Sequence, residues 1–463
     1  MTPSNGAAVA TVSGNDDLRA EVQKRTLRVV MLAQILGGLG LAAGISVGAL
    51  LAEELLGSDS VAGLPTALFT LGSAAAAFII GRLTQRSGRR LGLELGFIVG
   101  GIGAVGVVWA AAIDNVPLLF GSFLLYGAAT AANLQARYAG TDLALPDRRG
   151  KAISIAMVAT TIGAVAGPNL IAPLGSLASS LGLPELTGPF LLAAVANFAA
   201  GIALWIFLRP DPFLLAQQLE LESDSGVQGD APALEVEAAA ELEGTYLGAE
   251  DQEHDQDQQK SGKLQGRSFD GVVVGATVMV LTQIAMVAIM TMTPVHMSAH
   301  HFSLSAIGFV ISIHVAAMFL PSPVTGYLVD KYGRVPLSIA SAVTLLFAGL
   351  IAAFAPNNSL VLLIVALALL GLGWNFGLIA GTAMIVDATT LSNRGRVQGS
   401  VDVLIALAGA GGGAASGVVM ATSGFSGLSL IGGVLSLLLV PVLVWARSRS
   451  RARLDGTDQR HST

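Results

Sequence analysis

The chain has 463 residues, of which 53% are hydrophobic and only 12% are charged, about half the charged fraction of a typical soluble protein. So few charges cannot cover the surface of a soluble domain of this size, and we expect much of the surface to face lipid. The chain contains no cysteine, which excludes disulfides, zinc–thiolate sites and cysteine nucleophiles. The net charge of −6 comes largely from one acidic segment in the middle of the chain.

Twelve apolar stretches follow one another along the chain, each close to the roughly 20 residues that a transmembrane helix needs. They lie at 28–51, 60–80, 92–113, 116–137, 152–173, 187–208, 271–294, 304–328, 336–355, 359–385, 398–420 and 425–446. The sequence therefore predicts an all-α membrane protein with two six-helix bundles, 28–208 and 271–446. A polar tail (1–27) and a basic tail (447–463) flank the bundles.

The placement of positive charge predicts the orientation of these helices. With the N-terminus in the cytoplasm, 24 of the 25 Lys and Arg residues fall in cytoplasmic loops or tails, and the last, Arg137, lies at the inner end of the fourth helix. Positively charged loops stay on the cytoplasmic side of a membrane. We therefore expect a multi-pass protein of the cytoplasmic membrane with both termini inside.

The segment between the bundles, 209–270, differs in kind from the rest. Its part 211–257 holds 14 of the 31 acidic residues and few large apolar side chains. Such a composition cannot bury enough surface to fold alone. We interpret it as an acidic, flexible cytoplasmic linker; weak cation binding by the acidic cluster at 250–257 is an alternative.

Two sequence patterns recur at one offset, 245 residues (326 minus 81). They are GRLTQRSGR at 81–89 with GYLVDKYGR at 326–334, and Asp142 with RGK at 149–151, which recurs as Asp387 with RGR at 394–396. Two unrelated patterns at one offset indicate a duplicated six-helix unit. Parallel repeats of this kind are typical of secondary transporters that bind substrate between the halves.

The first pattern resembles the signature of the major facilitator superfamily (MFS), found between helices two and three and between helices eight and nine. The resemblance implies the MFS fold, two pseudo-symmetric bundles, transport by alternating access, and gates at these loops. Glycines would let helix ends approach, and basic residues would pair with carboxylates at inner helix ends; the alternative is that the arginines only set topology. Gln85 stands where the family usually has aspartate, so we expect a weaker lock in the first half. The candidate gate residues are Gly81, Arg86, Gly88, Arg89, Asp142, Gly326, Asp330, Lys331, Gly333, Arg334, Asp387 and Asp402.

Methionine and histidine gather in one short region. Six of the 11 methionines and four of the 6 histidines lie within 279–318. Met286 and Met290 share one face of helix seven, and His314 and Met318 share one face of helix eight. Thioether and imidazole groups form a soft donor set that suits Cu(I). The alternatives are methionines that only fill the core and a His314 that carries a proton or contacts an organic substrate, because ionisable groups inside membranes are usually functional.

A closer resemblance, to the CcoA-like copper importers of the MFS, rests on these Met and His pairs together with NLQARY at 133–138 and GWNF at 373–376. It implies copper import, with Met286, Met290, His314 and Met318 as ligands and copper as substrate rather than cofactor. Riboflavin transporters are similar around helix eight, so a small organic solute, imported or exported, is the alternative. Its cavity residues would be Asn133, Gln135, Arg137, Asn169, Gln283, Trp374 and Asn375.

Other functions are less consistent with the sequence. A membrane sensor that binds the same ligand without moving it would not need symmetric gates. No GxxxxGK[ST] motif indicates ATP binding, and nothing indicates an enzyme or a nucleic-acid partner. No carboxylate lies clearly in mid-membrane, so His314 is the candidate for a coupled proton. We expect a monomer in the lipid bilayer, acting on a small molecule or a metal ion.

Overall fold

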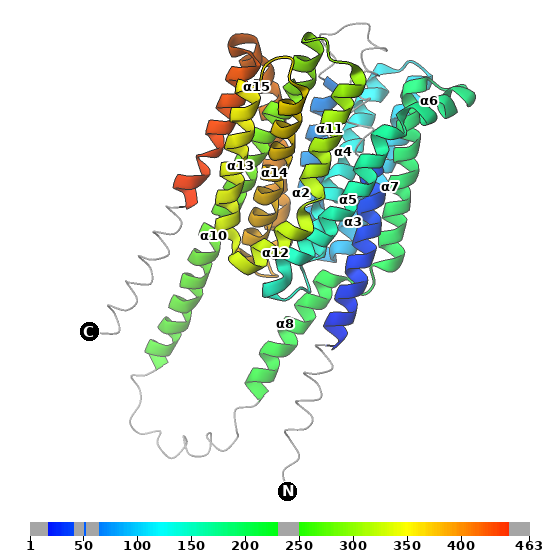
Figure 1. The fold of residues 1–463 in the computed structure, drawn as a ribbon. Helices are drawn as coiled ribbons and strands as arrows, with labels where there is room; N and C mark the ends of the chain where they lie inside the picture. Colours follow the sequence, from blue (N-terminus) through cyan, green and yellow to red (C-terminus); the bar gives the residue numbers. More distant parts are fainter. Residues whose placement is uncertain (1–16, 41–50, 52–63, 230–249, 444–463) are drawn as a thin grey trace, which may run out of the picture.

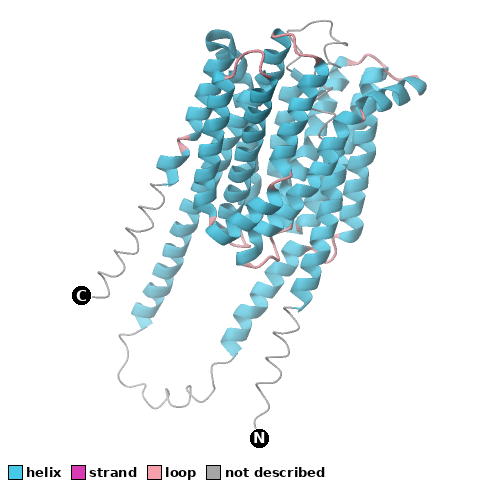
Figure 2. Ribbon diagram, viewed as in Figure 1, coloured by secondary structure: helices cyan, strands magenta, loops and turns pink. Residues whose placement is uncertain are grey.

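The computed structural model describes residues 17–40, 51, 64–229 and 250–443. Every regular element in this part of the chain is helical (Figure 2). Ten helical spans there are long and apolar enough to cross a membrane, and one of them, at 394–443, has 50 residues, enough for two passes. Each of the twelve predicted stretches overlaps a described helix, although positions 41–50 of the first lie outside the described residues.

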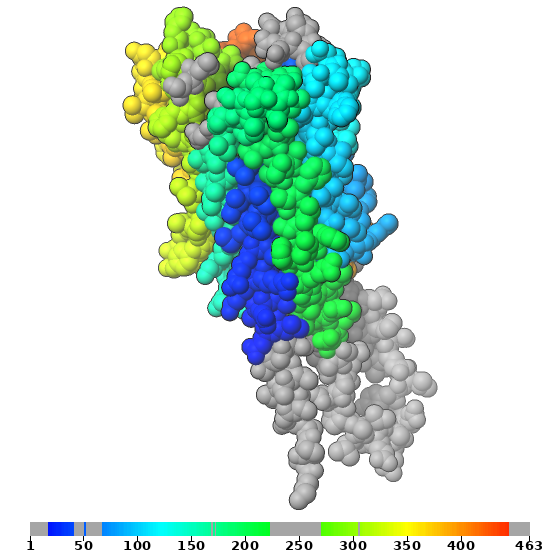
Figure 3. Space-filling view, turned by 90° about the vertical axis from the view of Figure 1, so that its right-hand side faces the viewer, coloured from blue at the N-terminus to red at the C-terminus, as the bar shows by residue number. Residues whose placement is uncertain are grey.

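The first half is built from helices that stand side by side in Figure 1. Residues 17–40 are helical and lie against α5 and α7, where Gly38 approaches the backbone of Thr160 and Gly40 approaches Asn197 (Figure 3). The elements that follow are α2 (Leu64–Ser87), α3 (Arg89–Ala112), α4 (Val116–Ala139), α5 (Arg149–Asn169), the short α6 (Ile171–Ser180) and α7 (Gly188–Phe207).

The second half follows the same plan with two irregularities. Its elements are α10 (Glu250–Ala299), α11 (Leu304–Phe319), α12 (Ser322–Tyr332), α13 (Arg334–Phe354), α14 (Leu360–Ala388) and α15 (Arg394–Ser436). The predicted eighth helix is divided into α11 and α12 at Pro321, which has no N–H to continue the helix. The predicted eleventh and twelfth helices run together in α15, which breaks at Gly424, where φ is 68°.

The segment predicted as a flexible linker begins with a helix, α8 (Pro212–Gly229). Its residue Phe213 is fully buried, and it packs in a cluster with Leu143 of the first half and Leu391 of the second. The start of the predicted linker is therefore helical and packed against both halves. Because most of the segment is acidic, its composition did not reveal the short apolar run through which α8 packs against the two halves. Residues 230–249 lie outside the described part.

The two halves meet along two seams. One runs between α2 and α15, and the other between α5 and the α11–α12 pair. Both seams are tight near the end of the molecule that carries α8, at the bottom of Figure 1, which we call the linker end. Since the repeat relates α2 to α12 and α15 to α5, the two seams are equivalent.

Candidate functional site

Glycines bring the two halves into backbone contact at the linker end. A Cβ on Gly81 of α2 would lie 2.6 Å from the Cα of Gly399 and 2.8 Å from the oxygen of Gly395, both in α15. At the repeat-related seam, a Cβ on Gly326 of α12 would collide with Gly150 of α5. Any side chain at either glycine would therefore force the halves apart, because only a small residue lets the helix backbones approach so closely.

Each seam also carries a side chain that caps a helix of the opposite half. Asp330 accepts hydrogen bonds from the N–H groups of Gly150 and Lys151, both at 2.8 Å, at the start of α5. At the equivalent position Gln85 accepts from the N–H of Gly395 at 2.9 Å and donates to the oxygen of Leu391 at 3.0 Å. A neutral amide thus makes two hydrogen bonds between the halves at the position where the family usually has aspartate. These bonds satisfy groups that a helix end leaves open.

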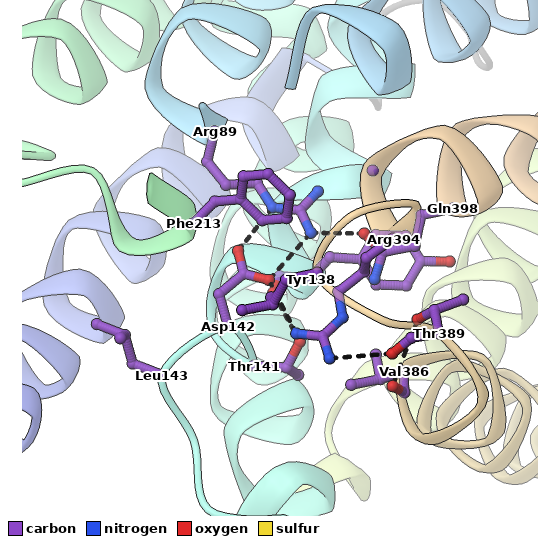
Figure 4. A network of polar contacts seen from close by, with 12 residues as sticks. Arg89, Tyr138, Thr141, Asp142, Leu143, Phe213, Val386, Thr389, Arg394 and Gln398 are labelled. Carbon is purple, nitrogen blue, oxygen red and sulfur yellow. Dashed lines mark hydrogen bonds and ion pairs between the residues drawn. The ribbon is translucent and has the colours of Figure 1, made fainter. Parts of the chain in front are cut away.

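Two clusters of Arg, Asp and Arg bridge the halves in the same symmetric way. In the first, Arg89 donates to Asp142 at 2.7 and 3.2 Å, and Arg394 of the other half approaches Asp142 at 3.9 Å (Figure 4). The ring of Phe213 lies 5.4 Å from the Arg89 guanidinium. The Asp142 and Arg89 side chains are fully buried. Removing one partner of a buried pair is costly because it leaves an uncompensated charge.

The second cluster is more open to solvent. Asp387 accepts from Arg334 at 2.8 Å and from Arg149 of the other half at 2.6 Å. Its side chain is 35% exposed, so solvent and salt screen this cluster more strongly than the buried one. Both Asp142 and Asp387 therefore contact an arginine of each half.

The remaining predicted gate residues lie beside these clusters. Gly88 and Gly333 have φ of 88° and 94°, a region that favours glycine, and they allow the sharp turns that lead into Arg89 and Arg334. The exposed Arg86 lines a shallow pocket with Arg82, Gln85 and Arg396. The exposed Lys331 lies 5.5 and 5.4 Å from the rings of Tyr327 and Tyr332.

A further ion pair joins α4 of the first half to α15 of the second. Arg137 of α4 donates to Asp402 of α15 at 2.7 Å, and both side chains are 1% exposed. Arg137 also donates to Tyr138 at 3.0 Å and to Thr382 at 3.1 Å. Arg137 was predicted to line a substrate cavity. In the structure it forms an ion pair with Asp402 that joins the two halves.

Two other predicted cavity residues serve the scaffold. Gln135 is buried and donates to the carbonyl of Ala77 in α2 at 2.8 Å. Asn375 of α14 donates to the carbonyl of Met318 at 2.7 Å and to Ser322 at 2.8 Å, and accepts from Thr325 at 2.6 Å. Asn375 thus binds both sides of the break at Pro321.

The remaining predicted cavity residues lie apart from one another, except for Trp374 and Gln283. Trp374 of α14 donates to Gln283 of α10 at 2.8 Å, and its ring meets that of Phe319 edge-on, with centroids 5.7 Å apart. Asn133 is buried beside Gly37, and its Nδ2 has no partner among the described residues. The side chain of Asn169, at the end of α5, lies outside the described part.

The four predicted copper ligands lie on helices that hardly touch each other. Met286 is buried in the apolar core of the second half, and Met290 and Met318 pack at its edge. The Nδ1 of His314 lies 2.8 Å from the carbonyl of Leu367 in α14, whereas its Nε2 has no partner among the described residues. α10 packs mainly against α14 and α15 rather than against α11. Within the described residues no group of three His, Cys, Asp or Glu side chains could hold a metal ion.

Some residues of the gate were not among the predicted site residues. The repeat could have pointed to Arg149 and Arg394, because the same 245-residue offset relates them to each other as relates Asp142 to Asp387. Gln85 was noted only as a departure from the family pattern. Thr382 and Gln398, which contact Arg137 and Arg89, follow no pattern in the sequence.

Comparison with known proteins identifies the family. A model of the Major Facilitator Superfamily matches residues 30–244 and 275–462. The chain belongs to this superfamily. It is a multi-pass membrane transporter, and the MFS fold predicted from the sequence is confirmed.

Several MFS relatives and structures are similar to the chain over most of its length. Two uncharacterized MFS-type transporters of Bacillus subtilis (strain 168), YdeG and YddS, are 55% and 52% identical, covering 96% and 92% of this chain and 96% and 91% of theirs. The riboflavin transporter RfnT of Brucella anthropi is 28% identical over 94% of this chain and 98% of its own.

Two solved MFS structures share the fold. The human organic anion transporter MFSD10 (TETRAN) has a TM-score of 0.63 at 18% identity, covering 91% of this chain and 99% of its own. The proton:xylose symporter XylE bound to 6-bromo-6-deoxy-D-glucose has a TM-score of 0.65 at 16% identity, covering 91% and 95%. None of these proteins is described as a copper importer, so they give the predicted copper branch no support.

Proposed function

We propose that this MFS protein carries a small organic solute across the cytoplasmic membrane by alternating access, with the linker end as its cytoplasmic gate. The observation that carries the proposal is the duplicated set of contacts at that end. Glycine seams, helix caps and Arg–Asp–Arg clusters each occur once per half and join the halves. Such contacts close one end of a transporter and must separate for its halves to rock.

A flat heteroaromatic molecule such as riboflavin is the substrate class that we propose. A relative named as a riboflavin transporter matches nearly the whole chain. Trp374, Phe319 and Gln283, from three helices of the second half, place two aromatic rings beside an amide, with Trp374 buried in this closed state. Flat rings stack on aromatic side chains, and an amide can bond their polar edges.

The direct test is transport of labelled riboflavin by the purified chain in proteoliposomes. We expect uptake or release that saturates with concentration and exceeds that of empty liposomes. Absence of flux in both directions, in protein that binds riboflavin, would favour a sensor. Absence of both binding and flux would remove the proposed substrate.

A pair of tryptophan variants separates the proposed site from the lipid-facing surface. Trp374→Leu removes the proposed stacking surface and should raise the KM for riboflavin at least tenfold. Trp205→Leu is the matched control, since Trp205 is 50% exposed on α7. Equal effects of the two substitutions on KM would contradict the proposed site.

Copper is a second candidate substrate, favoured by one observation. The Nε2 of His314 is buried without a partner among the described residues, as a metal-binding or substrate-binding nitrogen would be. If copper is carried, Met286→Leu, Met290→Leu and His314→Leu should each abolish copper accumulation while the protein still inserts. Normal accumulation in all three variants would exclude this ladder.

A further inference from the structure

The ion pair between Arg137 and Asp402 does not follow the repeat that organises the rest of the gate. The position equivalent to Arg137 in the second half is Thr382, and the position equivalent to Asp402 in the first half is Met157. Neither residue carries a charge, so the pair occurs once where the other gate contacts occur twice. Thr382 instead accepts a hydrogen bond from Arg137 itself. The pair is therefore not one of the duplicated contacts that join the halves at the linker end.

The surroundings of Asp402 make its charge dependent on the closed gate. The carboxylate is buried, and one oxygen, Oδ1, accepts from Arg137 at 2.7 Å. The other oxygen, Oδ2, is buried with no hydrogen-bond partner among the described residues. An ionised carboxylate in such a place is tolerated only while its partner is present. When the halves separate at the linker end, Arg137 leaves with the first half and Asp402 stays with the second.

Other titratable groups lie near the Asp402 carboxylate. From α4, Tyr138 lies 3.5 Å away, and from the start of α3, Arg89 adds a positive charge that is shared with Asp142. Arg394, two turns earlier in α15, approaches Asp142. Where α2 packs against α15 it presents Ala77 and Gly81, and its charged Arg82 and Arg86 lie beside Arg396 of α15. The residues that α10 and α13 place against α15 are Gln283 and Ile284, and Leu346 and Gly349.

We propose that Asp402 is a proton-binding site that couples a proton to the opening of the linker end. A proton binds Oδ2 and forms an O–H bond, which removes the negative charge, and the ion pair to Arg137 is lost. Arg137 keeps its own protons. When the gate closes again, the O–H bond breaks, the proton leaves to water, and the pair re-forms. One proton is thus bound and released per cycle. This inference rests on the proposed transport function and names its coupling ion; His314, the candidate predicted from the sequence, is not required for it.

The test follows the gate itself and needs no substrate. The chain has no cysteine, so spin labels can be placed at Ser87→Cys of α2 and Ser392→Cys before α15, two exposed positions on opposite halves of the linker end. In nanodiscs, pulsed EPR distances measured between pH 5 and 8.5 report the open fraction. We expect this fraction to rise severalfold as the pH falls.

Three variants identify the responsible group. Asp402→Asn should give a large open fraction that no longer depends on pH. Asp387→Asn, in the exposed cluster, is the matched control and should open the gate at every pH while keeping the pH dependence. Asp402→Glu, which keeps an ionisable group and carries the test if Asp402→Asn does not insert, should move the midpoint of the response.

The contradicting results are equally specific. An open fraction that does not change with pH in the native chain, an unaltered pH response in Asp402→Asn, or an unmoved midpoint in Asp402→Glu would each overturn the proposal. Because no solute is present, these outcomes are independent of whether riboflavin is carried. Failure of riboflavin flux alone would remove the proposed substrate and leave the proton site standing.

Discussion

Asn375 shows how a polar side chain inside a membrane protein can belong to the scaffold. Its amide bonds Met318 and Ser322 on the two sides of the helix break at Pro321. Proline leaves a backbone carbonyl without its usual partner, and in the absence of water such groups must be satisfied by neighbouring side chains. The sequence placed Asn375 in the predicted cavity because a buried amide looks the same in either role.

Replacing Asn375 therefore tests stability rather than transport. Asn375→Leu leaves several buried polar groups unpaired, each at a cost of about 1–3 kcal/mol, and should lower the thermal unfolding temperature measured in detergent. Asn133→Leu is the matched control, because the Nδ2 of Asn133 already lacks a partner among the described residues. An equal loss of stability in both variants would contradict the bracing role of Asn375.

Gln85 is a second residue whose role only the structure shows. Its two hydrogen bonds between the halves contribute roughly 1–3 kcal/mol together to the closed gate. Ser154 of α5 is fully buried beside Gly326 of the other half, so a cysteine at this position reports separation of the halves. In Gln85→Ala, a cysteine at position 154 should react with a maleimide about fivefold faster or more. Ser87→Ala, at an exposed neighbour, should leave the rate unchanged. An unchanged rate in Gln85→Ala would show that the amide does not hold the gate.

At the scale of elements, α8 is the part that the sequence analysis described least well. Its composition as a whole indicated a solvated segment, whereas burial of Phe213 depends on a few apolar positions at its start. Phe213→Ala removes a fully buried ring, a change that typically costs about 3–5 kcal/mol. We expect faster hydrogen exchange across 212–219. Leu214→Ala, at a position that is 37% exposed, is the control, and equal exchange in the two variants would contradict docking through Phe213.

The glycine seams set how closely elements of the two halves approach. Gly81→Val would place atoms inside the backbone of α15 and should hold the linker end open, so a cysteine at position 154 should label as fast as in an open protein. Gly121→Val adds the same side chain on α4, where no heavy atom lies within 4 Å of the added Cβ, and should have little effect. Slow labelling in Gly81→Val would mean that the seam is not the closing contact.

For the whole molecule, hydropathy and the repeat predicted two related six-helix bundles, and the resemblance of residues 81–89 to the family signature added the MFS fold. Each signal is averaged over many residues, so local irregularities such as the break at Pro321 do not disturb it. The gate was partly predictable because the repeat marks Asp142 and Asp387. The four predicted copper ligands lie on α10 and α11, so they could form one site only if these two helices packed against each other. Spacing shows that Met286 and Met290 share a face of α10, but it does not show that α10 packs against α14 and α15 instead of α11.

The central claim is that the halves must part at the linker end for solute to cross. It is tested most directly by cross-linking cysteines at positions 87 and 392, one in each half, and measuring flux of riboflavin in proteoliposomes. We predict that flux falls to the background of empty liposomes when the two cysteines are joined by a short reducible linker, and that it recovers on reduction. Flux that continues unchanged in the cross-linked protein would contradict the account.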